Sequence, residues 1–251
     1  MSALLDQLSR RQLVWHGDSQ QLAYQPVSSG YQELDQQLGG GLPATGLIDI
    51  QTEAGIGELR LLLPYLQQQQ QHSQRLLVFI GPPAELCADM LAGCDLELSQ
   101  LLIITPGEQP GAGQGSDKLT KLTTAAENPK SVKKFSPQQQ ALWAAEQCLQ
   151  SGCCASVLLW PAAISLAQAR RLQLAAEQGA ASMIVFRHSS QTLSLPVNLS
   201  ISLQPDPFGL QLTVLKRKGS WPAAPFRVSM QQQWPALCLA DKTAEPLRQA
   251  G

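Results

Sequence analysis

The chain has 251 residues, a formal net charge of −1 and 44 % hydrophobic residues, which suits one α/β domain with extensions or two small domains. The balanced charge gives no general reason to expect binding to nucleic acid or to a membrane. The six cysteines form no C-x-x-C pair and only three histidines are present, so the usual zinc-binding patterns are excluded.

No apolar run approaches the ~18 residues that a membrane-spanning helix needs. Met1 leads into a polar, Arg-containing segment, unlike a secretory signal. We therefore expect a cytoplasmic protein with reduced thiols.

Residues 1–25 are predicted to form an arm outside the core. Leu4, Leu5 and Leu8 lie on one side of a short amphipathic helix, and Trp15 follows it. Because this helix has no obvious place in the core, we expect it to dock on the chain's own core, on a second copy or on a partner. These four side chains are candidate partner contacts.

Residues 26–230 are predicted to form the core, in which strand and helix patterns alternate. A first helix is expected from Ser28 or Ser29 to Leu38, where Gly39 ends it. Apolar runs predict buried strands, and amphipathic periodicity predicts the helices between them. The expected strands span 46–50, 76–80, 101–104, 157–160 and 183–186, and the expected helices span 57–71, 83–91, 138–150 and 165–178. Such alternation predicts a mainly parallel sheet with helices on both faces.

The pattern changes after the last of these strands. Residues 197–203, 210–216 and 225–228 read as strands without helices between them, and a Pro- and Gly-containing turn joins the first two. We expect an antiparallel edge to the sheet. Residues 231–251 form a polar tail, in which Trp234 is a further candidate partner contact because an exposed indole suits an interface hot spot.

Residues 107–137 interrupt the core with a segment rich in Gly, Pro, Ser, Thr and Lys. Such a composition offers too few large apolar groups to offset the entropy of ordering the chain. We expect a mobile insert here.

The first strand, turn and helix of the core stand where a phosphate-binding loop with the pattern GxxxxGK[ST] would lie. Gly57 occupies the second Gly position, with Gly55 before it, but Thr52 replaces the first Gly. Glu58 stands at the Lys position and Leu59 at the hydroxyl position. A carboxylate there repels a triphosphate and neutralises the helix end that an anion would use. An ordinary strand–turn–helix explains the same residues, so we read the loop as degenerate.

Acidic residues that would hold a metal are also missing from two strand ends. The strand ending at Ile80 is followed by Gly81-Pro82-Pro83, and the strand ending at Trp160 is followed by Pro161. Together with the degenerate loop, these absences predict a protein that is not an enzyme. We expect no catalytic residues, no cofactor and no metal.

Basic residues cluster at Arg170 and Arg171 and again at Lys216, Arg217 and Lys218. Solvated ends of a helix and a strand explain them, and contact with DNA or a polymerase is the alternative. Two short clusters support weak, salt-sensitive DNA binding at most.

Several segments resemble the core of the RecA recombinase. They are Ser29-Gly30, Leu34-Asp35, Gly40-Gly41-Leu42-Pro43, Gly46, Leu215-Lys216-Arg217-Lys218 and Ala224-Pro225-Phe226. The resemblance implies a RecA-like three-layer sandwich, in which lysines at the positions of Lys216 and Lys218 reach a neighbouring subunit's nucleotide.

Within that superfamily the chain resembles the ImuA family of accessory proteins. The resemblance rests on Val14–Gly17, Gly55–Pro64, Ala141–Gln147, Arg171–Glu177 and Val214–Gly219, and it covers most of 14–229 apart from the insert. It implies a role in SOS-induced translesion DNA synthesis, with an ImuB-like inactive Y-family polymerase relative and an error-prone replicative-type polymerase as partners. Contact with RecA or self-association would also fit.

Two other functions stay open. The block Gly55–Pro64 also resembles SulA, a RecA-like cell-division inhibitor, and would then imply binding to FtsZ and a block of septation. The SulA family is shorter and lacks most of the region before the first strand, which favours the ImuA family. A divergent ATPase is the third possibility.

Overall fold

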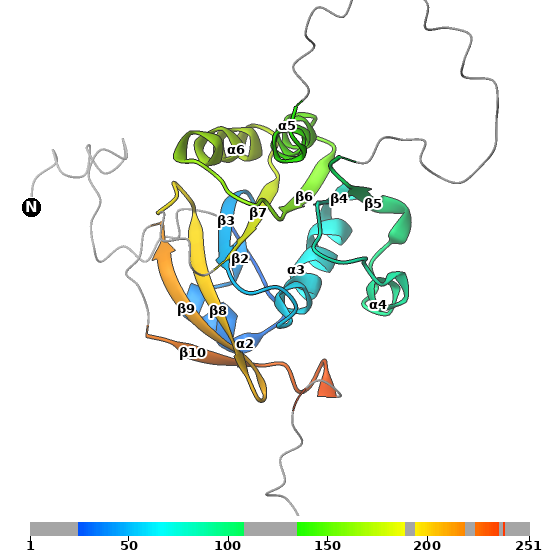
Figure 1. Cartoon of the computed structure of the whole chain (residues 1–251). Helices are drawn as coiled ribbons and strands as arrows, with labels where there is room; N and C mark the ends of the chain where they lie inside the picture. The colour runs from blue at the N-terminus through cyan, green and yellow to red at the C-terminus, as the bar shows by residue number, and fades with distance from the viewer. Residues whose placement is uncertain (1–24, 108–134, 189–193, 219–223, 236–237, 239–251) are drawn as a thin grey trace, which may run out of the picture.

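The computed structural model describes residues 25–107, 135–188, 194–218, 224–235 and 238 (Figure 1). The predicted arm, with Leu4, Leu5, Leu8 and Trp15, lies outside the described residues, as do most of the insert 107–137 and nearly all of the tail after Pro235. No helix in the described ranges is long and apolar enough to cross a membrane.

An eight-stranded sheet with the order β10-β9-β8-β3-β7-β6-β4-β5 forms the centre of the molecule. Strands β3 to β8 are parallel to one another, whereas β9 is antiparallel to both β8 and β10. The strands are β3 Gly46–Gln51, β4 Leu76–Ile80, β5 Leu101–Ile104, β6 Cys154–Leu159, β7 Ser182–Arg187, β8 Leu199–Asp206, β9 Gly209–Arg217 and β10 Phe226–Ser229. The mainly parallel α/β sheet with an antiparallel C-terminal edge is thus confirmed.

Helices cover both faces of this sheet (Figure 1). Helices α2, α3 and α4 pack on one face, and α5 and α6 on the other. The helices are α2 Gln32–Leu38, α3 Glu58–Ser73, α4 Ala88–Ala92, α5 Pro137–Gln150 and α6 Leu166–Gln178, with a short 3₁₀ turn at Leu98–Gln100. A separate two-stranded ribbon pairs β1 (Pro26–Val27) with β2 (Leu42–Pro43).

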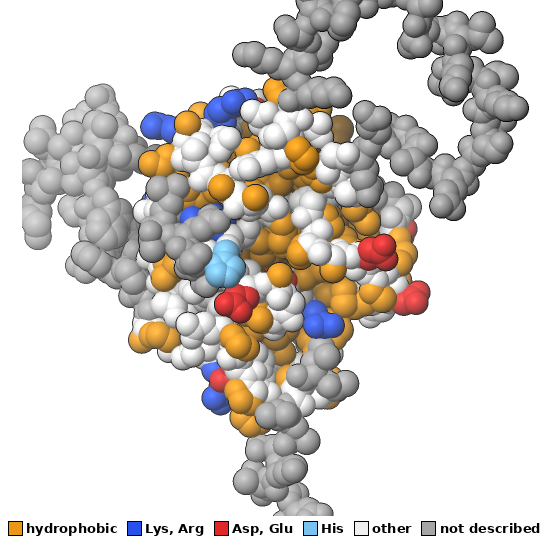
Figure 2. Space-filling model, in the orientation of Figure 1, with side chains coloured by type: hydrophobic (Ala, Val, Ile, Leu, Met, Phe, Trp, Pro, Cys, Tyr) orange, Lys and Arg blue, Asp and Glu red, His pale blue; other side chains and the backbone are white. Residues whose placement is uncertain are grey.

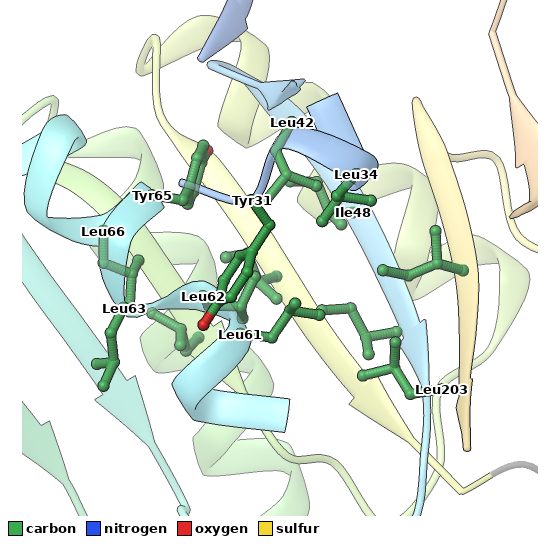
Figure 3. Close-up of a cluster of buried hydrophobic side chains, with 14 of the residues drawn as sticks. Tyr31, Leu34, Leu42, Ile48, Leu61, Leu62, Leu63, Tyr65, Leu66 and Leu203 are labelled. Carbon is green, nitrogen blue, oxygen red and sulfur yellow. The ribbon is translucent and has the colours of Figure 1, made fainter. Parts of the chain in front are cut away.

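The larger core lies between β3 and α3 (Figure 3). Leu61, Leu62 and Leu66 of α3 are fully buried there against β3 and its neighbours. Tyr65 is also buried, and its hydroxyl donates to the Pro43 carbonyl at 2.7 Å. Burial raises the pKa of the Tyr65 phenol to about 12. The leucine spacing that predicts an amphipathic helix therefore matches the face that α3 buries.

Two helices of the other face begin with matched capping boxes. Ser136 caps α5 and Ser165 caps α6, each accepting from the backbone N–H of the third helical residue, Gln139 or Gln168. The Gln side chain bonds back to the N–H of its cap residue. The predicted Ser165 cap is confirmed, and the box explains why both helices start sharply.

Two predicted helix starts are wrong. The first helix begins at Gln32, because Ser28 and Ser29 bond instead to the Asp35 carboxylate, with Ser29 N at 2.8 Å from Asp35 Oδ1. The helix expected from Pro83 begins only at Ala88. A proline can occupy a first turn, but here residues 83–87 form an irregular connection.

Gly41 provides a test of the turn that leads into β2. Its φ is +130°, and a Cβ added there would lie 2.1 Å from the Val27 carbonyl oxygen. We expect Gly41→Ala to lower the free energy of unfolding by about 2 kcal/mol, because strain at positive φ adds to the backbone clash. Urea denaturation measures this, with Gly55→Ala as control, since nothing lies within 4 Å of a Cβ there although φ is also positive. Equal losses in the two variants would contradict the role of the clash.

Candidate functional site

The carboxyl ends of β3, β4 and β6 meet at one edge of the sheet, which is where parallel α/β sheets bind their ligands. A pocket of about 440 Å³ opens there. Its walls are the turn between β3 and α3, the connection from β4 to α4, and Trp160 after β6. The predicted degenerate loop therefore does line a pocket at the expected place in the fold.

Glu58 fills the loop with its own carboxylate. It is the first residue of α3, and its side chain folds back over the turn. The Gly55 N–H lies 3.0 Å and 3.1 Å from the two carboxylate oxygens, and the Gly57 N–H lies 3.1 Å from Oε2. Glu58 is only 6 % exposed. The backbone donors that would hold a phosphate in such a loop are thus engaged by a negative charge from within the chain.

The other loop residues reinforce this arrangement. Thr52 is buried and its hydroxyl donates to the Glu53 carbonyl at 2.8 Å. Leu59 is partly buried against the core of α3 and offers no hydroxyl for a metal. Gly57, at φ 108°, turns the chain into α3. The loop has the length of a phosphate loop, but its polar groups bind one another.

The rest of the pocket is mostly apolar. Trp160 stacks on Phe186 with ring centroids 4.4 Å apart and lies 6.5 Å from Phe79. Pro82, Pro83, Leu86 and Met90 add further apolar surface. Figure 2 shows hydrophobic side chains across the middle of this face, between α3 and α5. Trp160 therefore serves both the core and the pocket wall.

Charged groups in the lining are few: Glu58, Arg60 and Glu85. Among the described residues, no group of three or more His, Cys, Asp and Glu side chains is placed to hold a metal ion. A magnesium–triphosphate needs cationic and hydroxyl donors beside its phosphates, and this lining supplies two carboxylates and one guanidinium.

Trp234 is half-buried, so the expectation of an exposed indole in the tail is wrong. Its ring packs against the core of the α2–α4 face, with the Arg60 guanidinium 5.5 Å from the ring centroid. Tyr31 lies beside them and donates to the Arg60 carbonyl at 3.3 Å. Burial raises the pKa of the Tyr31 phenol to about 12. Trp234 thus anchors the end of the described chain to α3.

The two basic clusters lie on different elements. Arg170 and Arg171 are exposed on α6, where Arg171 pairs with Glu146 of α5. The second cluster ends β9: Lys216 Nζ donates to the Leu195 carbonyl at 2.9 Å, and Arg217 Nη1 donates to the Gln37 carbonyl at 3.0 Å. Lys218 is exposed after the strand. Lys216 therefore ties the loop before β8 to the sheet, and Arg217 ties the end of α2 to it.

Sequence reasoning missed a buried ion pair between Asp49 of β3 and Arg187 of β7. Arg187 Nε and Nη2 donate to the two Asp49 oxygens at 2.6 Å and 2.7 Å, and both side chains are 1 % exposed. The Ser200 hydroxyl donates to the same carboxylate at 2.7 Å. A single Asp inside the apolar strand Gly46–Gln51 was the signal that could have predicted a buried partner, because an unpaired charge is rarely buried.

No family model and no curated protein matches the chain. Among solved structures, SulA from Pseudomonas aeruginosa is similar, with 22 % sequence identity and a TM-score of 0.38. The match covers 56 % of this chain and 97 % of that one. Similarity at this level defines neither a family nor a function.

Proposed function

We propose that this chain is a non-catalytic, RecA-like accessory protein of SOS-induced translesion DNA synthesis, which acts by binding other proteins. The observation that carries the non-catalytic part is the Glu58 carboxylate, which accepts hydrogen bonds from Gly55 and Gly57 inside the loop. The mutagenesis role comes from the resemblance to the ImuA family.

The arrangement of the core supports the RecA-like part of the proposal. The degenerate loop joins a central parallel strand, β3, to the helix α3 that packs on it. The segments that resemble RecA flank this unit: Gly40–Pro43 leads into β3, and Leu215–Lys218 ends β9, close to the sheet's antiparallel edge. The segments that resemble RecA therefore belong to the same domain as the degenerate loop.

The negative charge of Glu58 supports the proposal that the loop does not bind nucleotide. A triphosphate entering the loop would have to displace a carboxylate that holds two backbone N–H groups and would then lie beside its negative charge. Charge-assisted hydrogen bonds contribute about 1.5–3 kcal/mol, so ATP meets both competition and repulsion. Binding energy for the function must then come from surfaces that contact other proteins.

The proposed partners are an inactive Y-family polymerase relative and an error-prone replicative-type polymerase, in the cytoplasm of a cell responding to DNA damage. Affinity capture of the full tagged chain from damaged cells, followed by mass spectrometry, tests this. Recovery of the polymerase relative at near-stoichiometric amounts is the expected result. Recovery of a tubulin-like division protein instead would contradict it and favour the division-inhibitor alternative.

A further inference from the structure

A groove of about 380 Å³ lies between α5 and α6, outside the pocket described above. Its apolar lining comes from Phe135, Leu142, Trp143 and Leu172. Phe135 is 63 % exposed and Trp143 is 61 % exposed. Exposed aromatic side chains gathered at a groove mark a binding surface rather than the scattered apolar residues of an ordinary surface.

The fold does not account for Trp143. Helix α5 buries Ala141, Leu142, Ala145 and Leu149 against the sheet, and this set already completes its core face. Trp143 falls between them in sequence and projects to the outer side of the helix, where a polar residue would serve solubility better. Trp is one of the three residue types enriched at interface hot spots, with Tyr and Arg.

The polar side chains of the groove present hydrogen-bond donors. Gln139 and Gln168 use their carbonyl oxygens in the two capping boxes, accepting from Ser136 N at 2.9 Å and Ser165 N at 2.8 Å. Their amide nitrogens have no hydrogen-bond acceptor among the described residues. The capping boxes therefore fix the side chains so that each leaves an NH₂ group free to donate at the groove.

The charged side chains of the groove also present hydrogen-bond donors. Glu146 contributes the one carboxylate among the described lining residues, and Arg171 already pairs with it. The Arg171 side chain is 66 % exposed and keeps further donors, with Arg170 next to it. Figure 2 shows basic side chains over α6. The two charges of the lining balance, but the guanidinium is the exposed one of the pair, at 66 % against 16 % for the carboxylate. Together with the two amide nitrogens it favours an occupant that brings hydrogen-bond acceptors.

The direction of α5 and α6 also favours negative groups at the groove. Both α5 and α6 connect consecutive parallel strands of one sheet, so both run in the same direction and begin at the same edge. Gln138 Nε2 donates to the Ala163 carbonyl at 2.6 Å and ties the start of α5 to the loop before α6. Two positive helix ends therefore lie near Gln139 and Gln168 and favour negative groups there.

We propose that this α5–α6 groove binds an acidic amphipathic segment of a partner protein. Apolar side chains of the segment pack against Trp143 and Phe135, and its carboxylates face Arg171 and the amide nitrogens of Gln139 and Gln168. This is the helix-in-groove mode of recognition. The inference rests on the proposed function only in requiring a protein partner.

A designed peptide tests the groove directly. The probe is a fluorescein-labelled helical peptide with Leu on one face and Glu on the other, titrated with the full chain and followed by anisotropy. We expect saturable binding, weakened at least about tenfold by Trp143→Ala and reduced by Arg171→Glu. The same peptide with Lys in place of each Glu should not bind. Leu174→Ala, a control at a 52 % exposed apolar position of α6 outside the groove lining, should bind as the wild type does.

Four results would overturn the proposal. Equal binding by the wild type and Trp143→Ala, with circular dichroism showing both folded, would place the peptide elsewhere. A dimer in sedimentation that Trp143→Ala dissociates would assign the groove to a second copy. Binding that appears only after residues 108–134 are replaced by a Gly-Ser linker of equal length would assign it to the chain's own segment. If Trp143→Ala captured the polymerase relative at wild-type yield, the result would contradict binding at the α5–α6 groove but would leave the proposed function standing.

Discussion

Replacing Asp49 by alanine is expected to lower the free energy of unfolding by about 3–5 kcal/mol, because it leaves the buried Arg187 guanidinium without its carboxylate. The two side chains are each 1 % exposed and share two short hydrogen bonds. Ser200 loses its acceptor as well. Urea denaturation followed by circular dichroism measures the loss.

Two further variants make this result specific. Asp49→Val combined with Arg187→Met should lose much less than the sum of the single changes, because no charge then stays buried alone. Glu146→Ala breaks the exposed pair with Arg171, in which the arginine side chain is 66 % exposed, and should cost less than about 1 kcal/mol. Additive losses for Asp49 and Arg187 would show that the pair does not act as a unit.

Replacing Glu58 by alanine is expected to have two effects. The variant should be less stable by about 1.5–3 kcal/mol, because the carboxylate no longer accepts from Gly55 and Gly57. It should also gain an anion site, because the same backbone N–H groups become free at the N-terminus of α3. Removing the Glu58 carboxylate is thus expected to lower the stability of the fold and, at the same time, to open a binding site for an external anion.

Thermal unfolding in sodium sulfate and in sodium chloride at equal ionic strength separates these effects. Sulfate should raise the Tm of Glu58→Ala more than that of the wild type, by mass action on the folded state. Glu53→Ala is the matched control, since Glu53 lies in the same turn but is exposed. The same sulfate effect in all three proteins would mean that Glu58 does not occupy the anion site.

Local signals made most of the core predictable. Apolar runs located β3 to β7 because buried parallel strands need continuous apolar sequence, and Ser165 with Gln168 located the start of α6. The prediction of a helix start at Pro83 was wrong, because a proline is compatible with the first turn of a helix but does not by itself start one. No residue of that connection supplies the capping that Ser136 and Ser165 provide.

The candidate site was only half predictable. The replacement of Lys by Glu58 was visible in the pattern, but the direction of its side chain depends on α3 beginning at that residue. The Asp49–Arg187 pair joins residues 138 positions apart, and only the sheet order, with β7 beside β3, brings them together. Trp143 was hidden by an ordinary helical pattern, because its exposure depends on which face of α5 meets the sheet.

Equilibrium binding of ATP with Mg²⁺ to the full wild-type chain tests the central claim most directly. If Glu58 closes the loop, a titration with labelled nucleotide, carried to millimolar concentrations and followed by calorimetry or anisotropy, should show no saturable binding. Saturable binding in the micromolar range would contradict the account, because it would require the Glu58 carboxylate to leave Gly55 and Gly57 and the loop to accept a triphosphate.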